Sequence, residues 1–479
     1  MTEQGLAGVL PALERRVAAL VRESHLPGAA AGIVRGRDLV WSGGFGFADV
    51  ATHQRPHAGT LFRVASITKT FTATAILQLR DQGKLRLDDP IVRYLPEYAR
   101  VQTRFGTIED TTFRRLLSHR SGLITEGPFS YWDTLDFPSI DEVLANLGET
   151  EVAIEPDSAS KYSNLGFALM GEVVARLSGL PYEEYIQQRI FDPLQMTSST
   201  FAPNGALRDR LATGYNPHPF EDEPSPAGHT STRGIIAAAG LYTTVEDLAR
   251  WIAFQFQGEA GEHSAKTVLS GRTVAEMHQP QDIDPTWRMA RCLGWMAQRN
   301  GERIYHGHGG SIHGFITQIL FSTSHKTGVI VLTNEGRHSV ANAIAVEMLD
   351  RLGDTLDAVS PILDWQPPKP APAAWKRYLG RYEYWRGGLI HVEARDGSLV
   401  LALPPGIPSS LHAPAPLEPT DEPHVFRVVS GRAAGELLVF TESAGGDVTG
   451  FTLAGFRYAI LHAAHEQTPP QGVGEGRTE

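Results

Sequence analysis

Cysteine is nearly absent from this chain of 479 residues, which contains a single one, Cys292. One thiol cannot form an intramolecular disulfide, so a disulfide-stabilised scaffold is excluded. The cysteine content does not indicate whether the protein works in an oxidising or a reducing compartment. Cys292 lies in RMARCLGWMAQ, and we expect it to be a small packed side chain. The chain also has no run of about 18 apolar residues, which argues against a membrane-spanning helix.

An excess of positive charge is missing as well. The 43 Lys and Arg residues are outnumbered by 54 Asp and Glu, the formal net charge is −11, and there is no basic tract. Nucleic acid is therefore a poor partner. Residues 1–20 lack a basic segment followed by a sustained apolar core, so we predict no secretory signal and a cytoplasmic protein.

Two catalytic signatures are also absent. The string G-x-S-x-G of the α/β-hydrolases does not occur. His306, His308 and His313 lie close together in sequence, but no zincin-type helix motif accompanies them. We therefore predict no metal and no cofactor. Among the residues that are present, 42% are hydrophobic and 20% charged, as in a soluble globular protein.

Ser66 and Lys69 stand one helical turn apart in LFRVASITKTFTATAILQL, where an apolar approach leads into a helix-forming stretch that ends near Gly83. Residues three apart share a helix face, so both side chains are expected to enter the same space. A serine hydroxyl needs a neighbouring base, and a lysine becomes one when burial lowers its pKa. Without other motifs, the pair favours a non-catalytic interpretation, in which Ser66 helps to start its helix and Lys69 is a solvated surface lysine.

Tyr162 and Asn164 belong to EPDSASKYSNLGFALMGEVVARL, at the entry to an apolar run with helical periodicity. A short polar loop at such a place can present side chains to a cleft. In isolation Tyr162 is typical of a half-buried aromatic residue and Asn164 of a helix N-cap.

A third motif lies in RIYHGHGGSIHGFITQILFST, among apolar and β-branched residues. It predicts the end or edge of a strand that another backbone approaches closely. By itself His308 indicates a structural histidine. The motif consists of His308, Gly309, Gly310 and Ser311.

Two further strings imitate catalytic motifs. Ser158 and Lys161 repeat the S-x-x-K spacing, but no apolar helix follows them. Lys326-Thr327-Gly328 spells K-T-G between two strand-like runs, where it predicts a hairpin turn with Gly328 as the permissive residue. We interpret the first string as a loop coincidence and Lys326 as solvated.

The order S-x-x-K, Y-x-N and H-x-G resembles that of the penicillin-recognising serine hydrolases, namely class C β-lactamases, D,D-peptidases, D-aminopeptidases and related esterases. Other stretches are similar too, including LRLDDPIVRYLPEY, TTFRRLLSHRSGL, RIFDPLQMTSST and AAGLYTTVEDLARWI. The resemblance covers roughly residues 8–355.

The resemblance implies a catalytic role for Ser66, Lys69 and Tyr162. Ser66 attacks a carbonyl, while Lys69 and Tyr162 share its proton, with the charge of Lys69 lowering the pKa of Tyr162. It also implies an oxyanion hole from the backbone N–H groups of Ser66 and Ser311. Substrate contacts are expected from Asn164, His308, Gly309, Gly310 and Ser311.

The H-x-G form bears on the substrate, which we expect to be a small molecule or a short peptide. A K-T-G lysine offers a permanent cation to a carboxylate, whereas His308 is neutral much of the time near pH 7. Small esters, amides or D-amino-acid peptides are therefore favoured. A β-lactamase or D,D-carboxypeptidase is the alternative, and a non-turnover penicillin-binding or assembly protein is an alternative of another class.

The chain is expected to divide near residue 361. Residues 1–360 resemble the β-lactamase-like α/β (α+β) fold, an antiparallel sheet flanked by helices plus a mostly helical lobe. A proline-rich linker over 361–374 leads to short alternating stretches at 375–465, which predict a small antiparallel β-barrel. YLGRYEY resembles the start of a lipocalin-like domain, which caps the cleft or mediates assembly in relatives, so a homo-oligomer stays open. Residues 466–479 are predicted to be disordered.

Overall fold

The structure is a computed structural model of the chain. It divides into two compact units, Met1–Ser360 and Pro361–Glu479. Much of the proposed linker and all of the proposed tail lie outside the described residues. The description omits residues 1–2, 130, 217–224, 230, 258–267, 337–339, 359–368, 385–387, 396, 403–413, 431–432 and 464–479.

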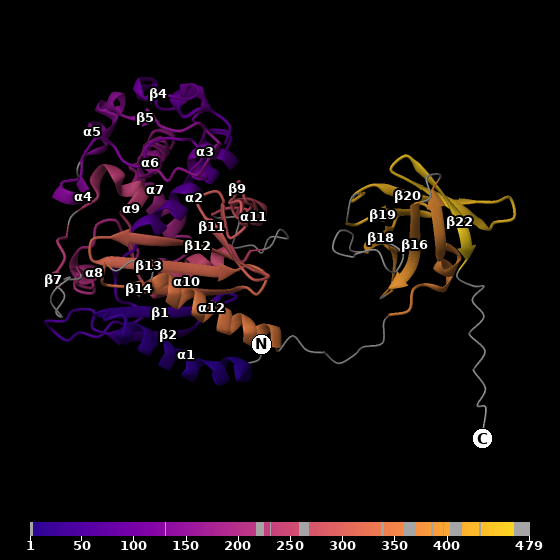
Figure 1. Cartoon of the computed structure of the whole chain (residues 1–479), viewed down its shortest axis with the longest axis horizontal. Coiled ribbons are helices and arrows are strands. Elements are labelled where there is room, and N and C mark those ends of the chain that lie inside the picture. Colours follow the sequence, from indigo (N-terminus) through magenta and orange to yellow (C-terminus); the bar gives the residue numbers. More distant parts are fainter. Residues whose placement is uncertain are drawn as a thin grey trace, which may run out of the picture. The chain divides into compact units, whose positions relative to one another are not determined.

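An eight-stranded antiparallel sheet forms the centre of the larger unit (Figure 1). Its order is β2-β1-β14-β13-β12-β11-β10-β9, so two N-terminal strands pair with strands from the end of the unit, with Ala30 opposite Leu332. This confirms the predicted antiparallel sheet flanked by helices. The strands are β1 (Gly28–Arg35), β2 (Asp38–Gly46), β9 (Asp282–Ile283), β10 (Met289–Arg291), β11 (Met296–Asn300), β12 (Arg303–Ile312), β13 (Phe315–Ser322) and β14 (Thr327–Thr333).

Helices cover both faces of this sheet. On one face, α1 (Glu3–Glu23) and α12 (Val340–Ala358) pack apolar side chains such as Leu352 against Val331. On the other face, α10 (Val245–Gln255) places Trp251 on Phe71 of α2 (Thr68–Asp81), with 4.0 Å between ring centroids. Each such fully buried side chain contributes about 2–3 kcal/mol of transfer free energy, so the sheet and α2 form one rigid core.

The segment between the sheet's two parts forms the predicted, mostly helical lobe (Figure 1). α2 runs through its centre, and every residue from Thr68 to Leu79 is buried. Around it lie α3 (Phe113–Leu117), α4 (Tyr131–Thr134), α5 (Ile140–Ala145), α6 (Asn164–Ser178), α7 (Tyr182–Ile186), α8 (Gly205–Arg208), α9 (Ile236–Ala239) and α11 (Gly271–Met277). Three small sheets pair β3 (Phe62–Arg63) with β8 (Tyr242–Thr243), β4 (Gln102–Thr103) with β5 (Glu151–Val152), and β6 (Tyr215–Asn216) with β7 (Ser225–Pro226).

The smaller unit is the predicted antiparallel barrel, closed by pairing of its first and last strands. Aromatic side chains fill its interior: the rings of Tyr378 and Phe440 stack at 4.2 Å, and Phe451 is fully buried. The strands are β15 (Gly380–Tyr384), β16 (Gly388–Arg395), β17 (Ser398–Ala402), β18 (Ala415–Pro419), β19 (Val425–Val428), β20 (Leu437–Glu442), β21 (Val448–Leu453) and β22 (Phe456–Ala463).

The two imitations of catalytic motifs have structural explanations. Lys161 lies outside any helix and donates to Thr125 Oγ1 at 3.1 Å. Lys326 is exposed in the β13–β14 hairpin, as predicted. The expectation for Gly328 is wrong: Lys326 itself takes the left-handed conformation, with φ 47°. Gly328 lies within β14, where a Cβ would stand 2.5 Å from Ile252 Cγ2 of α10, so close packing explains that glycine.

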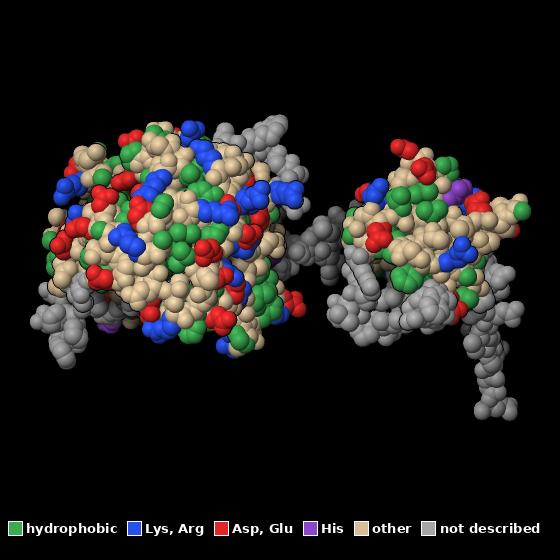
Figure 2. Space-filling view, turned by 90° about the horizontal axis from the view of Figure 1, so that it is seen from above, with side chains coloured by type: hydrophobic (Ala, Val, Ile, Leu, Met, Phe, Trp, Pro, Cys, Tyr) green, Lys and Arg blue, Asp and Glu red, His purple; other side chains and the backbone are tan. Residues whose placement is uncertain are grey.

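Charged side chains of both signs are interspersed over the face of the larger unit shown in Figure 2. Cys292 is buried, as expected, and its thiol contacts the His278 carbonyl at 3.2 Å. In the part of the chain that the structure describes, no helix has the length and apolar character needed to cross a membrane.

Candidate active site

Ser66 lies in a 3₁₀ turn, Ala65–Ile67, which joins β3 to α2. Ala65 has φ 44°, a conformation that non-glycine residues rarely adopt, so packing must hold the turn in place. The Val64 amide, just before the turn, donates to the Leu241 carbonyl at 3.0 Å and ties it to β8. The half-buried Ser66 side chain therefore has a fixed position one turn before Lys69.

Lys69 is completely buried, and its ammonium group is surrounded by three acceptors. Nζ lies 3.1 Å from Ser66 Oγ, 2.6 Å from Asn164 Oδ1 and 2.9 Å from the Ala238 carbonyl. Burial lowers the pKa of Lys69 to about 7, against the charge of Glu126, which raises it. A large fraction of Lys69 is therefore a neutral amine near pH 7.

The Tyr162 ring contacts two groups that carry nitrogen. Lys69 Nζ lies 4.8 Å from the ring centroid, and the His119 ring packs against it with 4.2 Å between centroids and a tilt of 33°. Burial raises the pKa of Tyr162, and this outweighs the opposing effects of its hydrogen bond with Ser66 and of the Arg291 charge. The expected lowering of this pKa by Lys69 is wrong, because desolvation of the phenolate is the larger effect. Tyr162 is protonated at neutral pH.

Asn164 connects Lys69 to a carboxylate that the sequence analysis did not select. Its Oδ1 accepts from Lys69, and its Nδ2 donates to Glu126 Oε1 at 2.5 Å. The interpretation of Asn164 as an N-cap is wrong, since Ser163 caps α6 by accepting from the Gly166 amide at 2.9 Å. The Asn164 side chain is thereby available to the site.

His308, Gly309, Gly310 and Ser311 lie on β12 beyond the end of its pairing with β11, which stops at Gly307. That free edge faces the Ser66 turn. A Cβ on Gly310 would meet the Val64 carbonyl oxygen at 2.0 Å, so the expected close backbone approach occurs there. His308 Nδ1 donates to the Gly309 carbonyl at 2.6 Å. Burial, and then the nearby Lys69, lower the pKa of His308 to about 3, so its ring is neutral.

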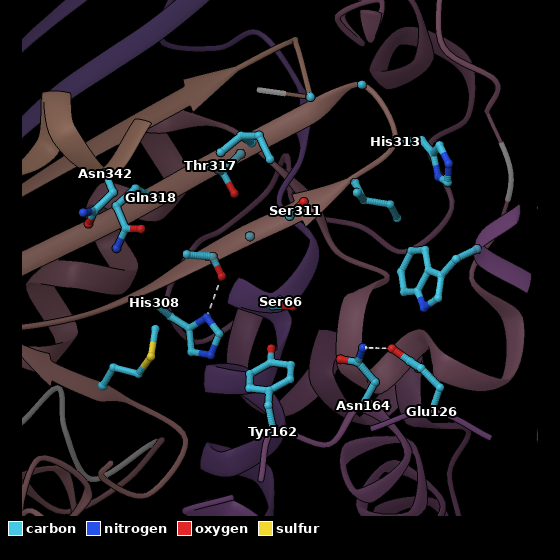
Figure 3. Close-up of a pocket in the computed structure, with 18 of the residues that line it drawn as sticks. Ser66, Glu126, Tyr162, Asn164, His308, Ser311, His313, Thr317, Gln318 and Asn342 are labelled. Carbon is cyan, nitrogen blue, oxygen red and sulfur yellow. Dashed lines mark hydrogen bonds between the residues drawn. The ribbon is translucent and has the colours of Figure 1, made fainter. Parts of the chain in front are cut away.

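These groups border one cavity of about 680 Å³. Figure 3 shows the Ser66 and Tyr162 hydroxyl groups and the His308 ring facing the same space, with Glu126 joined to Asn164. Lys69 lies beneath the cavity rather than on its wall. The structure thus brings together all eight residues selected from sequence: Ser66, Lys69, Tyr162, Asn164, His308, Gly309, Gly310 and Ser311.

Sequence analysis missed Glu126 and His119. Glu126 precedes a loop rich in Gly and Pro, and no local pattern marks it as a site residue. His119 lies in a stretch that carried the resemblance, but its contact with Tyr162 depends on tertiary packing. Among the described residues, no cluster of three His, Cys, Asp or Glu side chains has the arrangement of a metal site.

A profile of the family described as Beta-lactamase matches residues 13–350. The chain belongs to this beta-lactamase family of serine hydrolases. Beta-lactamase-like protein 2 of Dictyostelium discoideum is 31% identical over 247 residues, 49% of this chain and 43% of that protein. The chain therefore spans less than half the length of that relative. The D-alanyl-D-alanine-carboxypeptidase/endopeptidase AmpH of Escherichia coli strain K12 is 28% identical over 322 residues, 64% of this chain and 80% of that protein.

Solved structures of the beta-lactamase family share the architecture. The octameric penicillin-binding protein homologue from Pyrococcus abyssi aligns with a TM-score of 0.63 and 24% identity, over 94% of this chain and 99% of its own. A D-stereospecific amidohydrolase from Streptomyces sp. aligns with a TM-score of 0.56 and 26% identity, over 70% of this chain and 97% of its own. Because the alignment with the Pyrococcus abyssi protein covers 94% of this chain, it supports the fold of both the larger unit and the barrel.

Proposed function

We propose that this member of the beta-lactamase family hydrolyses small amides, esters or peptides containing a D-amino acid through an acyl-enzyme on Ser66. One observation carries the proposal: Lys69 Nζ lies 3.1 Å from Ser66 Oγ, and the pKa of Lys69 is lowered to about 7. A base at hydrogen-bond distance with a pKa near the working pH is what activates a serine hydroxyl.

In the proposed reaction, neutral Lys69 accepts the Ser66 proton as Oγ attacks the carbonyl carbon. The backbone N–H groups of Ser66 and Ser311 bind the oxyanion, each contributing about 3 kcal/mol to the transition state. Protonated Tyr162 donates its proton to the leaving nitrogen or oxygen and regains one from Lys69. Water then releases the acyl group. Titration of Lys69 and Tyr162 is coupled, so the pair acts as one acid–base unit.

Charge in the cavity supports a substrate with an amine in preference to one with a carboxylate. His308 is neutral where a permanent cation would attract a carboxylate, and the Glu126 carboxyl group lines the same cavity. Glu126 accepts from Asn164 and Tyr131, and a carboxylate retains further acceptor capacity. An ammonium group of an amino-acid amide would find a partner there.

A second candidate is D,D-carboxypeptidase or β-lactamase activity. The Escherichia coli relative, whose name describes a D-alanyl-D-alanine carboxypeptidase and endopeptidase, favours it, since 80% of that protein aligns. Rates on D-alanine amide, a D-alanyl-D-alanine dipeptide and a chromogenic cephalosporin would separate the two. Faster turnover of the amide would support the first proposal, and faster turnover of the dipeptide or cephalosporin the second.

The deciding experiment is hydrolysis of a short-chain p-nitrophenyl ester by the wild type and Ser66→Ala. We expect kcat/KM to fall by on the order of 10⁴-fold or more, because Ser66 supplies the hydroxyl that Lys69 contacts. Ser158→Ala is the matched control, since Ser158 belongs to the imitation S-x-x-K and its hydroxyl donates to the Glu155 carbonyl. Equal turnover in wild type and Ser66→Ala would refute the assignment.

Substrate preference is tested by His308→Lys, which introduces a cation at the cavity wall. We expect kcat/KM for a substrate with a free carboxylate to rise about tenfold relative to an amine-bearing amide, corresponding to one ion pair of modest strength. Circular dichroism would check folding, since His308 is buried. An unchanged ratio in a folded variant would contradict the charge argument.

A further inference from the structure

Another cavity, of about 440 Å³, is lined by Arg63, which forms no ion pair with any described residue. It lies between β3, β8, α8 and the segments 211–214 and 227–229, and none of its described lining residues borders the active-site cavity. We call it the arginine cavity.

Arg63 supplies the charge at its inner wall. The residue is only 2% exposed, and its Nη2 is buried without a hydrogen-bond partner. Within the described ranges its contact is the face of the Tyr242 ring, 5.5 Å from the guanidinium carbon. A guanidinium stays protonated in proteins, and one aromatic face recovers only part of the cost of removing it from water. Arg63 therefore lacks the partner that a buried charge requires.

The rest of the lining is also suited to an anion. Arg208 borders the same cavity and forms no ion pair with any described residue, while His229 Nε2 lies 2.9 Å from the Tyr242 hydroxyl. No Asp or Glu occurs among the described lining residues.

We propose that the arginine cavity binds an oxyanion, the carboxylate or phosphate group of a small ligand, with Arg63 as the principal contact and Arg208 as the second charge. The planar fork of a guanidinium matches the two oxygens of such a group. β3 pairs with β8 through Arg63 and Tyr242 and leads directly into the Ser66 turn. The bound anion stabilises the strand on which the nucleophile turn rests.

Thermal unfolding at constant ionic strength tests the proposal, with chloride replaced stepwise by inorganic phosphate or by acetate. A ligand that binds only the native state raises Tm with a saturable concentration dependence. We expect this response for at least one of the two anions. The anion with the lower half-saturation concentration tells whether the ligand group is a phosphate or a carboxylate. Absence of a saturable response to both would overturn the proposal.

Arginine variants test whether the anion-dependent rise in Tm comes from binding in the arginine cavity. Arg208→Gln should raise the half-saturation concentration about tenfold, the effect of one charge-assisted contact. Arg272→Gln is the matched control, because Arg272 is exposed on α11 and does not line this cavity. Arg63→Met should abolish the response, and Arg208→Gln carries the test if that variant does not fold. A response equal to wild type in Arg208→Gln would overturn the site.

The proposal does not depend on the catalytic assignment. Ser66→Ala should retain the anion response in full, because Ser66 does not line the arginine cavity. Loss of ester turnover and persistence of the anion response in this one variant would separate the two proposals.

Discussion

At the scale of single residues, the site depends on the burial of Lys69. Desolvation lowers its pKa to about 7, and desolvation raises that of Tyr162, because burial disfavours whichever form is charged. The two shifts have opposite consequences for catalysis. In the proposed reaction the neutral amine acts as the base, and the phenol keeps the proton that it donates to the leaving group.

The pKa shifts of Lys69 and Tyr162 predict how the rate depends on pH. Below about 7 Lys69 is protonated and cannot accept the Ser66 proton, so kcat/KM for a neutral ester should fall tenfold per pH unit below that value and level off above it. His308, with its pKa lowered to about 3, does not titrate in this range. Rates measured between pH 5 and 9 in one ionic strength would check this.

The Glu126→Gln variant tests whether the fall of kcat/KM below pH 7 reports the titration of Lys69. Glutamine keeps an acceptor for Asn164 but removes the charge that raises the pKa of Lys69, so the midpoint should move to lower pH. Glu149→Gln serves as a control, because Glu149 lies outside the cavity. A midpoint that stays unchanged or moves upward would mean that another group limits the rate.

Each site residue that sequence analysis selected belongs to a short motif. In such a motif the spacing along the chain predicts which side chains lie close together. Ser66 and Lys69 meet because they are three apart at a helix start. Glu126 reaches Asn164 only through a loop whose conformation is set by tertiary packing. The direction of the Tyr162 pKa shift was missed for a similar reason, since the burial of Tyr162 against His119 cannot be read from sequence.

At the scale of elements, the site depends on the approach of β12 to the turn before α2. The backbone of Gly310 lies so close to the Val64 carbonyl that no Cβ fits between them. Thr317 Oγ1 of β13 also donates to this carbonyl at 3.3 Å. The strand edge and the nucleophile turn are therefore held at one separation.

Gly310→Ala should break this arrangement. The added carbon would stand 2.0 Å from the Val64 oxygen, so β12 or the turn must shift, and a displacement of about 1 Å costs about 10²-fold in kcat/KM. In Gly309→Ala the nearest atom, at 2.7 Å, is Oε1 of the flexible Gln318 side chain. The smaller loss expected there makes it the control, measured with the same ester, and equal losses would contradict the argument.

Periodicity and turn residues predicted the main elements well. The helix after Ser66, the helix after Tyr162 and the β13–β14 hairpin all occur. The 3₁₀ turn at Ser66 was not predicted, because it depends on Ala65 being held at positive φ by its neighbours. The turn residue of the hairpin was misplaced because Gly328 is required for packing against α10.

At the scale of the molecule, the chain has separate hydrophobic cores. The barrel encloses its own cluster of buried side chains, which includes Phe440 and Phe451, and the larger unit packs its clusters around the sheet. The closed barrel was predictable from alternation and turn spacing. Its role was not, because that depends on contacts that strand patterns do not encode.

Phe440→Ala tests the independence of these cores in the full chain. Removing this buried ring should destabilise the barrel by about 3–5 kcal/mol while ester hydrolysis at 25 °C stays unchanged. Scanning calorimetry should show one transition moving down and the other staying in place. A matched change in the sheet, Ile330→Ala, should move the other transition, and coincident shifts of both would contradict independent folding.

The three acceptors around Lys69 have a stereochemical consequence. Once the amine is neutral, it keeps two N–H bonds and one lone pair, and the Asn164 oxygen and the Ala238 carbonyl can only accept. Ser66 is the one neighbour of the three with a proton to give. The lone pair is thus directed at the Ser66 hydroxyl, and Glu126, by fixing which end of the Asn164 amide faces the amine, sets that direction from a distance.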